Sequence, residues 1–341
     1  MSRLAAALCA AAFAVYPAFG QSMSPGLAES YLQRPVGARA LGLAGAYTAV
    51  SNEPNALFFN PAGLGFLFDK PQFSLTVAPL ALGRTQGSLA YAQKIYPEFS
   101  IGAGVNSLLH KSFTGRNAAG QETGTFSNQQ YTFAVGAAWH NDDISLGASG
   151  KYLLNTLSGA SASGTAFLAD FGAKVNMFDL FTIGAAIQNI GGRISWDGTA
   201  NNDLIPFTFR GGAAMEIGLN EETYEVRSTV RGEPETISLP ATQYVLVSLD
   251  VVAHQHDKTP FLLLGAEYVH TDFFSVRGGM AVLSDNLGKA EFLPFTTWGA
   301  GVSIIPPIPS LPFQFHIEYA LSGDAAAGSG IANTISLLMQ F

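Results

Sequence analysis

Past residue 70 the sequence alternates between hydrophobic and small or polar residues with a period of two, in segments of about 10 to 14 residues separated by turn residues. A period of two predicts β-strands, because successive side chains of a strand point to opposite faces. Fourteen segments fit the pattern, at approximately 72–82, 85–95, 99–110, 129–140, 144–157, 164–177, 181–192, 207–219, 241–254, 260–271, 273–283, 296–305, 313–323 and 332–341.

The two faces of these strands differ in character. In the strand predicted over 164–177, Phe167 and Phe171 share one face, whereas Asp170 and Lys174 share the other. The polar faces are mostly Gly, Ala, Ser and Thr with sparse charge, which is too bland for a surface exposed to water. We therefore expect the apolar faces to contact lipid and the bland faces to line an enclosed interior.

Composition supports a membrane protein without spanning helices. Of the 341 residues 48% are hydrophobic and only 12% are charged, where a soluble domain carries about a quarter. Outside the first 20 residues no stretch is apolar for long enough to span as a helix, and five prolines interrupt the uncharged stretch 292–317. These properties predict an all-β transmembrane antiparallel β-barrel of 14 strands, an even number as expected for a bacterial outer-membrane barrel.

Connection lengths fit a barrel whose strands are joined by long outer loops and short periplasmic turns. The predicted outer loops include 111–128, 158–163, 193–206 and 284–295, and short turns lie at 96–98, 141–143, 178–180 and 272. Two connections break the pattern. Gly83-Arg84 is very short for an outer loop, and 220–240 is long for a periplasmic turn, so it is either a solvated hairpin or a sign of miscounted strands.

The N-terminus has the features of a secretory signal peptide over residues 1–20. Arg3 precedes an apolar run from Leu4 to Val15, and small residues end at Gly20. A lipoprotein anchor at Cys9 is the alternative, but Leu8 is too large for the position before such a cysteine. Cleavage after Gly20 leaves a chain without cysteine, which uses neither disulfides nor thiol chemistry.

Residues 21–70 lack the alternation of the strands and are rich in Gly and Ala. Asn52 before Pro54 predicts the start of a short helix, and Asn60-Pro61 predicts its end. A barrel of this size is too wide for its own side chains to fill. We therefore expect 21–70 to form a small N-terminal plug in the lumen of a barrel that spans 71–341.

This segment also carries a resemblance to a known family. Val36-Gly-Ala-Arg-Ala-Leu-Gly-Leu-Ala-Gly-Ala-Tyr-Thr-Ala-Val50, Ser51-Asn-Glu-Pro-Asn-Ala56 and Phe59-Asn-Pro-Ala-Gly-Leu64 resemble the N-terminal signature of the PorV/PorQ outer-membrane proteins, relatives of the FadL long-chain fatty-acid transporters. The resemblance implies a plugged fourteen-strand barrel. The alternation of Ile335, Leu337, Met339 and Phe341 is similar to the closing strand of such barrels. The positions that match the plug motif are Asn60, Pro61, Ala62 and Gly63.

The resemblance implies two functions. PorV-like members are partners in protein export by the type IX secretion system and meet secreted cargo or secretion components, whereas FadL-like members let hydrophobic small molecules diffuse passively through the barrel. Loop 111–128 is polar and too short for a helical hairpin, which disfavours the capture of fatty acids. The sequence therefore favours export, with passive transport as the alternative and a purely structural membrane protein as a third possibility.

Charged residues on the predicted inner face have mixed signs. Enclosed charges of mixed sign are more typical of mutual pairing and plug anchoring than of ion selectivity, because an unpaired desolvated charge is costly. On this interpretation Asp170→Ala or Arg210→Ala would loosen the plug and raise conductance. The predicted inner-facing charges are Lys151, Asp170, Lys174, Arg210, Glu216, Asp250, Glu267, Arg277 and Glu318.

No pattern predicts catalysis, a cofactor or a structural metal. The only metal-like cluster, His254-Gln-His-Asp257, has no evident third ligand, and Asn141-Asp-Asp143 is more typical of a turn. Nucleotide-binding and nucleophile motifs are absent from the sequence. A net charge of −8 without a basic stripe argues against nucleic acid as a partner, which leaves outer-membrane lipid and the protein or small-molecule partners named above.

Overall fold

A computed structural model describes residues 28–67, 69–160, 162–178, 180–198, 202–220, 222–227, 234–239, 241–255, 260–271, 273–282, 298–308, 311–324 and 330–341. The signal peptide predicted over 1–20 and the outer loop predicted over 284–295 lie outside these residues, as do His256 and Asp257.

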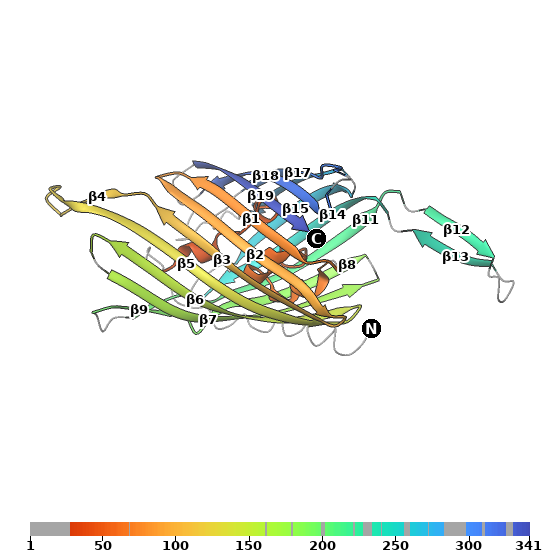
Figure 1. Ribbon diagram of the computed structural model, residues 1–341, viewed down its shortest axis with the longest axis horizontal. Helices are drawn as coiled ribbons and strands as arrows, with labels where there is room; N and C mark the ends of the chain where they lie inside the picture. Colours follow the sequence, from red (N-terminus) through yellow and green to blue (C-terminus); the bar gives the residue numbers. More distant parts are fainter. Residues whose placement is uncertain are drawn as a thin grey trace.

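Within the described residues, fourteen strands form the wall of a closed antiparallel β-barrel (Figure 1). Closure is made by the first strand, β1, which pairs with both β2 and the last strand, β19. The wall strands are β1 (Gln72–Leu80), β2 (Arg84–Tyr96), β3 (Phe99–His110), β5 (Glu122–His140), β6 (Ile144–Ser158), β7 (Ala162–Met177), β8 (Phe181–Ile190), β11 (Thr208–Gly218), β14 (Gln243–His254), β15 (Phe261–His270), β16 (Phe274–Val282), β17 (Trp298–Ile304), β18 (Gln314–Asp324) and β19 (Gly330–Gln340).

The predicted strand count is confirmed, and most strand ends agree within two residues. The largest difference is β5, which begins at Glu122 because its first residues pair with β4 (Phe113–Arg116) in a hairpin beyond the barrel (Figure 1). A second hairpin joins β9 (Arg193–Trp196) to β10 (Asn202–Leu204). The outer connections predicted over 111–128 and 193–206 therefore contain strand pairing that the prediction did not include, because continued pairing satisfies backbone groups that a loop would leave to water.

The assignment of the two faces is also confirmed. Phe167, Val135 and Ile335 are 75%, 65% and 58% exposed on the outer surface, whereas Asp170 and Glu267 on the opposite face are 0% and 2% exposed. Within the described part of the chain, no helix is both long and apolar enough to cross a membrane.

The two irregular connections have simple explanations. Leu82 and Gly83 both have positive φ, 60° and 69°, as the mirror-image turn of a tight β-hairpin requires, so β1 and β2 need no longer loop. In the 220–240 connection, β12 (Glu222–Arg227) and β13 (Pro234–Leu239) pair with each other in a separate two-stranded sheet. The connection is therefore a hairpin, and the strands of the wall were not miscounted.

Aromatic side chains contact one another near both ends of the barrel, as is typical of the two membrane interfaces. Tyr152 contacts Phe167 at the outer end, with ring centroids 5.0 Å apart. At the other end Phe313 contacts Phe341, with centroids 5.7 Å apart. This second end, where β1 begins and β19 ends, is the one that the sequence assigns to the periplasm.

The exposed apolar face predicts a large penalty for a charge at mid-height. Replacing Val135, at the centre of the wall portion of β5, by arginine should destabilise the barrel by about 2–4 kcal/mol. The matched control is Thr125→Arg in the exposed β4–β5 hairpin, which should stay within about 0.5 kcal/mol of the parent. Urea unfolding in phospholipid vesicles, followed by tryptophan fluorescence, measures both. Equal losses for the two variants would contradict a lipid-facing Val135.

Candidate functional site: the interior of the barrel

The N-terminal segment, residues 28–67, lies against the inner faces of strands all around the wall. Its short helices are η2 (Ser30–Gln33), α2 (Ala38–Gly42), η3 (Pro54–Phe58) and η4 (Pro61–Phe66). The helix α2 contacts β16 to β19, η3 contacts β1 to β3 and β5, and η4 contacts β2, β3 and β5 to β7. Nearly every residue from 31 to 67 is buried, so this segment forms the core of the barrel.

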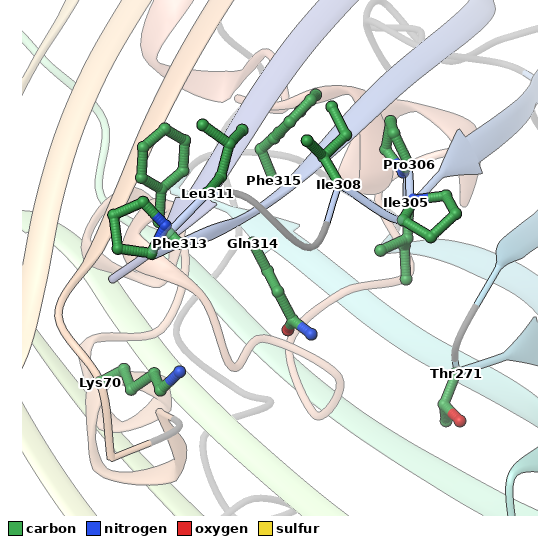
Figure 2. Close-up of a pocket in the computed structure, with 11 residues that line it drawn as sticks. Lys70, Thr271, Ile305, Pro306, Ile308, Leu311, Phe313, Gln314 and Phe315 are labelled. Carbon is green, nitrogen blue, oxygen red and sulfur yellow. The ribbon is translucent and has the colours of Figure 1, made fainter.

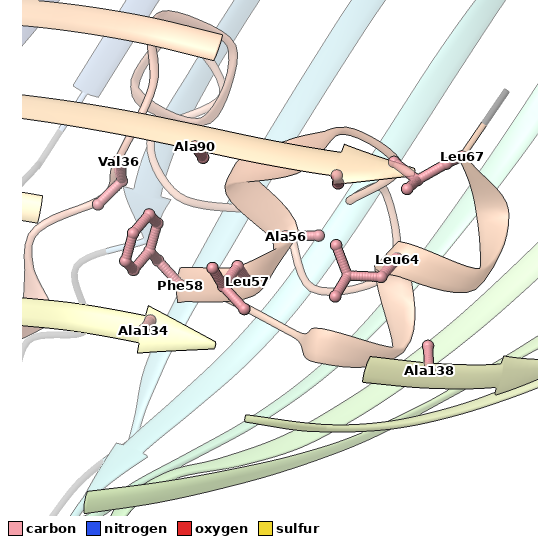
Figure 3. Close-up of a cluster of buried hydrophobic side chains, with 10 residues drawn as sticks. Val36, Ala56, Leu57, Phe58, Leu64, Leu67, Ala90, Ala134 and Ala138 are labelled. Carbon is pink, nitrogen blue, oxygen red and sulfur yellow. The ribbon is translucent and has the colours of Figure 1, made fainter. Parts of the chain in front are cut away.

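Apolar packing on one side of the segment is shown in Figure 3. Leu57 and Phe58 of η3 and Leu64 of η4 form one buried cluster with alanines of the wall, among them Ala90 and Ala134. Small wall residues let the larger side chains of the segment approach the strands closely, so the contact excludes water.

Glycines of the inner faces bring the two backbones still closer. A Cβ atom built on Gly172 would fall inside 3.0 Å of the Asn60 side chain, and one on Gly299 inside 3.0 Å of the Leu41 carbonyl oxygen. Both distances are shorter than real Cβ atoms show, so these positions admit only glycine unless the segment moves. The same holds for Gly147 against Pro61, Gly184 against Thr48 and Gly279 against Leu43.

Asn60 is the centre of the predicted plug motif. Its side chain is fully buried, accepts a hydrogen bond from the Ala62 amide (3.2 Å) and caps η4. Its Nδ2 donates to the carbonyl oxygens of Thr48 (3.0 Å) and of Ala173 in the wall (3.3 Å). Pro61 follows at the first helical position, where a missing N–H costs nothing, and Gly63 lies against Ser51.

Helix η3 begins one residue later than the predicted start, with Glu53 as its N-cap and Pro54 in its first turn. The Glu53 carboxyl is buried and accepts a hydrogen bond from Asn55 Nδ2 (3.2 Å). Burial raises its pKa, and the neighbouring Glu318 carboxylate raises it further, against the opposing effect of Arg39.

The predicted inner-facing charges fall into groups, and eight of the nine are buried; the exception is Glu216, which is exposed. Asp250 and Arg210 hold the segment at Thr48. Asp250 Oδ2 accepts hydrogen bonds from the amides of Tyr47 (3.0 Å) and Thr48 (2.9 Å) and from the Thr48 hydroxyl (2.5 Å). Arg210 donates to the Gly45 carbonyl oxygen (2.9 Å), and its guanidinium carbon lies 4.9 Å from the centre of the Phe59 ring.

A second group links the segment to three strands through Arg39. Arg39 pairs with Glu267 at 2.9 Å, Glu267 pairs with Arg277 at 3.1 Å, and Arg277 pairs with Glu318 at 3.1 Å. Arg39 also donates to Asn52 Oδ1 (2.7 Å), which braces the segment internally. On the opposite side of the lumen Lys174 donates to the Ser51 carbonyl oxygen (2.6 Å).

A third group lies in the wall itself. Asp170 pairs with Lys151 at 2.5 Å and accepts a hydrogen bond from the Asn189 amide (2.8 Å). Asn189 has a positive φ of 62°, and the β7–β8 register shifts at this point, so Asp170 supplies the acceptor that the bulged ladder lacks. The expectation that Asp170 anchors the segment does not fit this arrangement, because Lys151 and Asn189 both belong to strands of the wall.

The sequence did not single out Arg39, Glu53 or the inner glycines. Arg39 and Glu53 lie within the family signature between Val36 and Leu64, which assigns no role to either residue. A glycine in a strand indicates a close approach only once the segment packed against it is known. Among the described residues no group of three metal-binding side chains occurs. His254 is buried, with its Nδ1 hydrogen-bonded to the Thr208 hydroxyl at 2.8 Å.

A pocket of about 320 Å³ lies at the periplasmic end, beneath the connection between β17 and β18 (Figure 2). Ile305, Ile308 and Leu311 supply apolar lining, while Lys70 and Gln314 project towards its open centre. Its volume is at the lower end of the range of ligand sites.

Similarity to known proteins is found in the fold. No protein-family model matches the sequence, and no curated protein matches it. The fold is similar to that of the toluene transporter TbuX of Ralstonia pickettii, with a TM-score of 0.50 and 15% identity over 89% of this chain and 97% of that one. The chain is a bacterial outer-membrane β-barrel.

Two further solved structures superpose on this chain slightly less well than TbuX does. A Pseudomonas aeruginosa FadL homologue has a TM-score of 0.47 and 11% identity over 94% of this chain and 99% of that one. The P. putida toluene transporter TodX has a TM-score of 0.49 and 12% identity over 84% and 92%. The similarity to TbuX concerns the fold, and none of the three is a PorV or PorQ protein.

Close approach at Gly172 leads to a first test of the interior. Gly172→Ala should destabilise the seated segment by about 1–3 kcal/mol, because the new methyl overlaps Asn60. The control is Gly150→Ala, whose Cβ would meet nothing within 4 Å. Limited proteolysis of the N-terminal segment in vesicles should be faster for the first variant only. Adding Asn60→Ala to Gly172→Ala should remove most of the extra effect, since the overlap is then absent; full additivity would contradict the assigned contact.

The anchoring groups lead to a second test. Asp250→Ala removes the acceptor of three hydrogen bonds. It also leaves the buried Arg210 guanidinium, which lies 4.0 Å from the Asp250 carboxylate, without that partner, a loss of about 3–5 kcal/mol for a buried pair. Single-barrel conductance in planar bilayers should therefore rise. Asp170→Ala should destabilise the barrel but leave conductance at the parent level. If both variants conducted alike, the division between segment anchors and wall pairs would be wrong.

Proposed function

We propose that the protein is a passive, non-enzymatic transporter of small hydrophobic molecules across the outer membrane, with the N-terminal segment as its plug. The observation that carries the proposal is the interior itself, which is filled by a segment seated on glycines and buried ion pairs. Hydrophilic solutes need a continuous water path across a barrel, whereas here nearly every residue of the segment from 31 to 67 is buried in the interior. A hydrophobic molecule needs no such path if the plug yields locally.

The fold supports this proposal over the export role favoured by the sequence. TbuX, which has the same architecture, is a toluene transporter. In this chain the outer connection 111–128 is a polar β-hairpin, so capture would differ from that of a barrel with an apolar helical hairpin. On this proposal, the pocket at Lys70 and Gln314, at the end assigned to the periplasm, is a candidate exit for such a molecule.

The export role remains a second proposal, and it rests on the signature between Val36 and Leu64. On that proposal the interior is only a rigid scaffold, and cargo or secretion components bind the ends of the barrel. Co-purification from detergent separates the two functions, because bound protein cargo favours export and bound hydrophobic molecules favour transport.

Transport can be tested by locking the plug. The Ala38 amide donates to Ser336 Oγ (2.9 Å). A double variant with Ala38→Cys and Ser336→Cys should therefore form a disulfide between α2 and β19. The chain has no other cysteine after Gly20 that could compete. Uptake of radiolabelled toluene by cells producing this variant should fall at least fivefold when oxidised and recover with reductant. Each single-cysteine variant is a control and should respond to neither treatment.

Parental uptake in the oxidised double variant would exclude passage past the segment at α2. No barrel-dependent uptake in the parent would contradict transport of this class of solute.

A further inference from the structure

Glu53 is a buried carboxyl that neither proposed function uses. It is the N-cap of η3 and is only 3% exposed. None of the ion pairs between described residues includes it, and Asn55 Nδ2 donates to it at 3.2 Å. The same nitrogen lies 3.0 Å from Ser74 Oγ of β1, so Glu53 is held close to the wall. An isolated carboxylate is costly in a water-poor interior, and such a group normally takes up a proton instead.

The ion pairs around Arg39 are complete without Glu53. Glu267 lies between the guanidinium groups of Arg39 (2.9 Å) and Arg277 (3.1 Å), and Glu318 pairs with Arg277 (3.1 Å). We call these four residues, together with Glu53, the Glu53 cluster. With every carboxyl ionised, the cluster would hold three negative charges against two positive ones. One proton removes the excess charge, and Glu53 is the carboxyl that lacks a guanidinium partner.

Neighbouring groups do not supply that partner. Lys174 reaches the segment from β7, but it donates to the Ser51 carbonyl oxygen (2.6 Å) and belongs to none of the ion pairs between described residues. The Tyr47 phenol, which lies near Glu53, is fully buried and brings no positive charge. Three further titratable groups act on other members of the cluster, namely Glu216 and Tyr244 on Arg39 and His316 on Glu318.

The strands that contact η3 are β1, β2, β3 and β5. Lys94 of β2 already pairs with Asp69 at 2.8 Å. The charged and imidazole side chains of these strands all lie at or near the strand ends, and they are Arg84, Lys94, His110, Glu122 and His140. The proton on Glu53 is therefore the simplest source of neutrality in the cluster.

A proton at this position couples the seating of the segment to pH. Burial is the main cause that raises the pKa of Glu53, and the Glu318 carboxylate raises it further. If the segment is displaced into water, the carboxyl returns to its ordinary pKa and releases its proton. Seating is therefore strongest below the ordinary pKa, and it weakens as the pH rises towards the raised one.

We propose that Glu53 is a proton-binding site that controls whether the N-terminal segment stays seated. With the proton bound, the Glu53 cluster is neutral, and the pair of Arg39 with Glu267 holds the segment on the wall. Loss of the proton places an unpaired negative charge beside Glu318, and the two carboxylates repel each other. The segment then loosens, and the barrel conducts more at alkaline pH. The proposal is independent of what passes through the barrel.

Conductance of the full-length barrel in planar bilayers of phosphatidylcholine tests the proposal. Single-barrel conductance of the parent should rise roughly threefold between pH 5 and pH 9, because the seated form loses its proton over this range. Glu53→Gln reproduces the neutral carboxyl in nearly the same shape, so it should stay at the low parental value at both pH values. The matched control is Glu122→Gln, which removes an exposed carboxyl paired with Arg116 in the β4–β5 hairpin and should keep the parental response.

A second variant tests the part played by the neighbouring carboxylate. Glu318→Gln removes the like charge beside Glu53, so the midpoint of the conductance change should fall by about one pH unit. An unchanged midpoint would contradict the proposed repulsion. A parent whose conductance does not depend on pH, or a full pH response in Glu53→Gln, would overturn the proposal.

Infrared difference spectra of the same barrel in vesicles detect the proton directly. Between pH 5 and pH 9 the parent should lose the carbonyl band of a protonated carboxylic acid, and Glu53→Gln should lack this change. If the parent shows no such band, Glu53 holds no proton and the proposal fails, whatever the variants conduct. Each variant is compared only after its heat-modifiable gel mobility shows a folded barrel, and the parental spectra decide the matter even if a variant does not fold.

Discussion

A fourteen-strand barrel encloses more space than its own inward side chains can fill, and this constraint shapes the rest of the molecule. The N-terminal segment fills the space, and the wall is adapted to it. Where the segment passes closest, at Gly172 and Gly299, the inner face carries no side chain. Where the segment leaves backbone groups inside the barrel, wall side chains satisfy them, as Ser336 does for the Ala38 amide. The glycine content of the strands is thus a property of the interior contact.

The buried charges serve this contact in a specific way. A buried ion pair is weak evidence for stability, because apolar residues of similar volume often serve as well. Its value here is geometric: Asp250 accepts from donors at Tyr47 and Thr48, and Glu267 joins Arg39 of the segment to Arg277 of the wall. A segment packed through alanine and glycine alone could slide, whereas one held at two separate charged points has a single register.

The strands could be predicted from the sequence, whereas the pairing of charged residues inside the barrel could not, for a physical reason. A shift of one residue would turn Phe171 inward and Asp170 to lipid, so the period of two fixes both the strand and its face. No such periodicity marks which charges meet, since Arg39 and Glu267 come together only through closure of the barrel. The role of Asp170 depends on the bulge at Asn189, which leaves no mark in the hydrophobic pattern, and the hairpin of β4 with β5 was hidden because polar strands outside the membrane resemble loops.

The filled interior also bears on how transport and export would differ. An export partner would need only the exposed ends of the barrel for binding. The buried ion pairs around Arg39 would then be more extensive than a scaffold for those ends requires. A transporter must both block ions and let a hydrophobic molecule pass. Hydrogen bonds and ion pairs suit this double demand, because they hold the segment in one register yet can be re-formed after a small displacement. If the protein is a transporter, these polar contacts are therefore where the segment would be displaced.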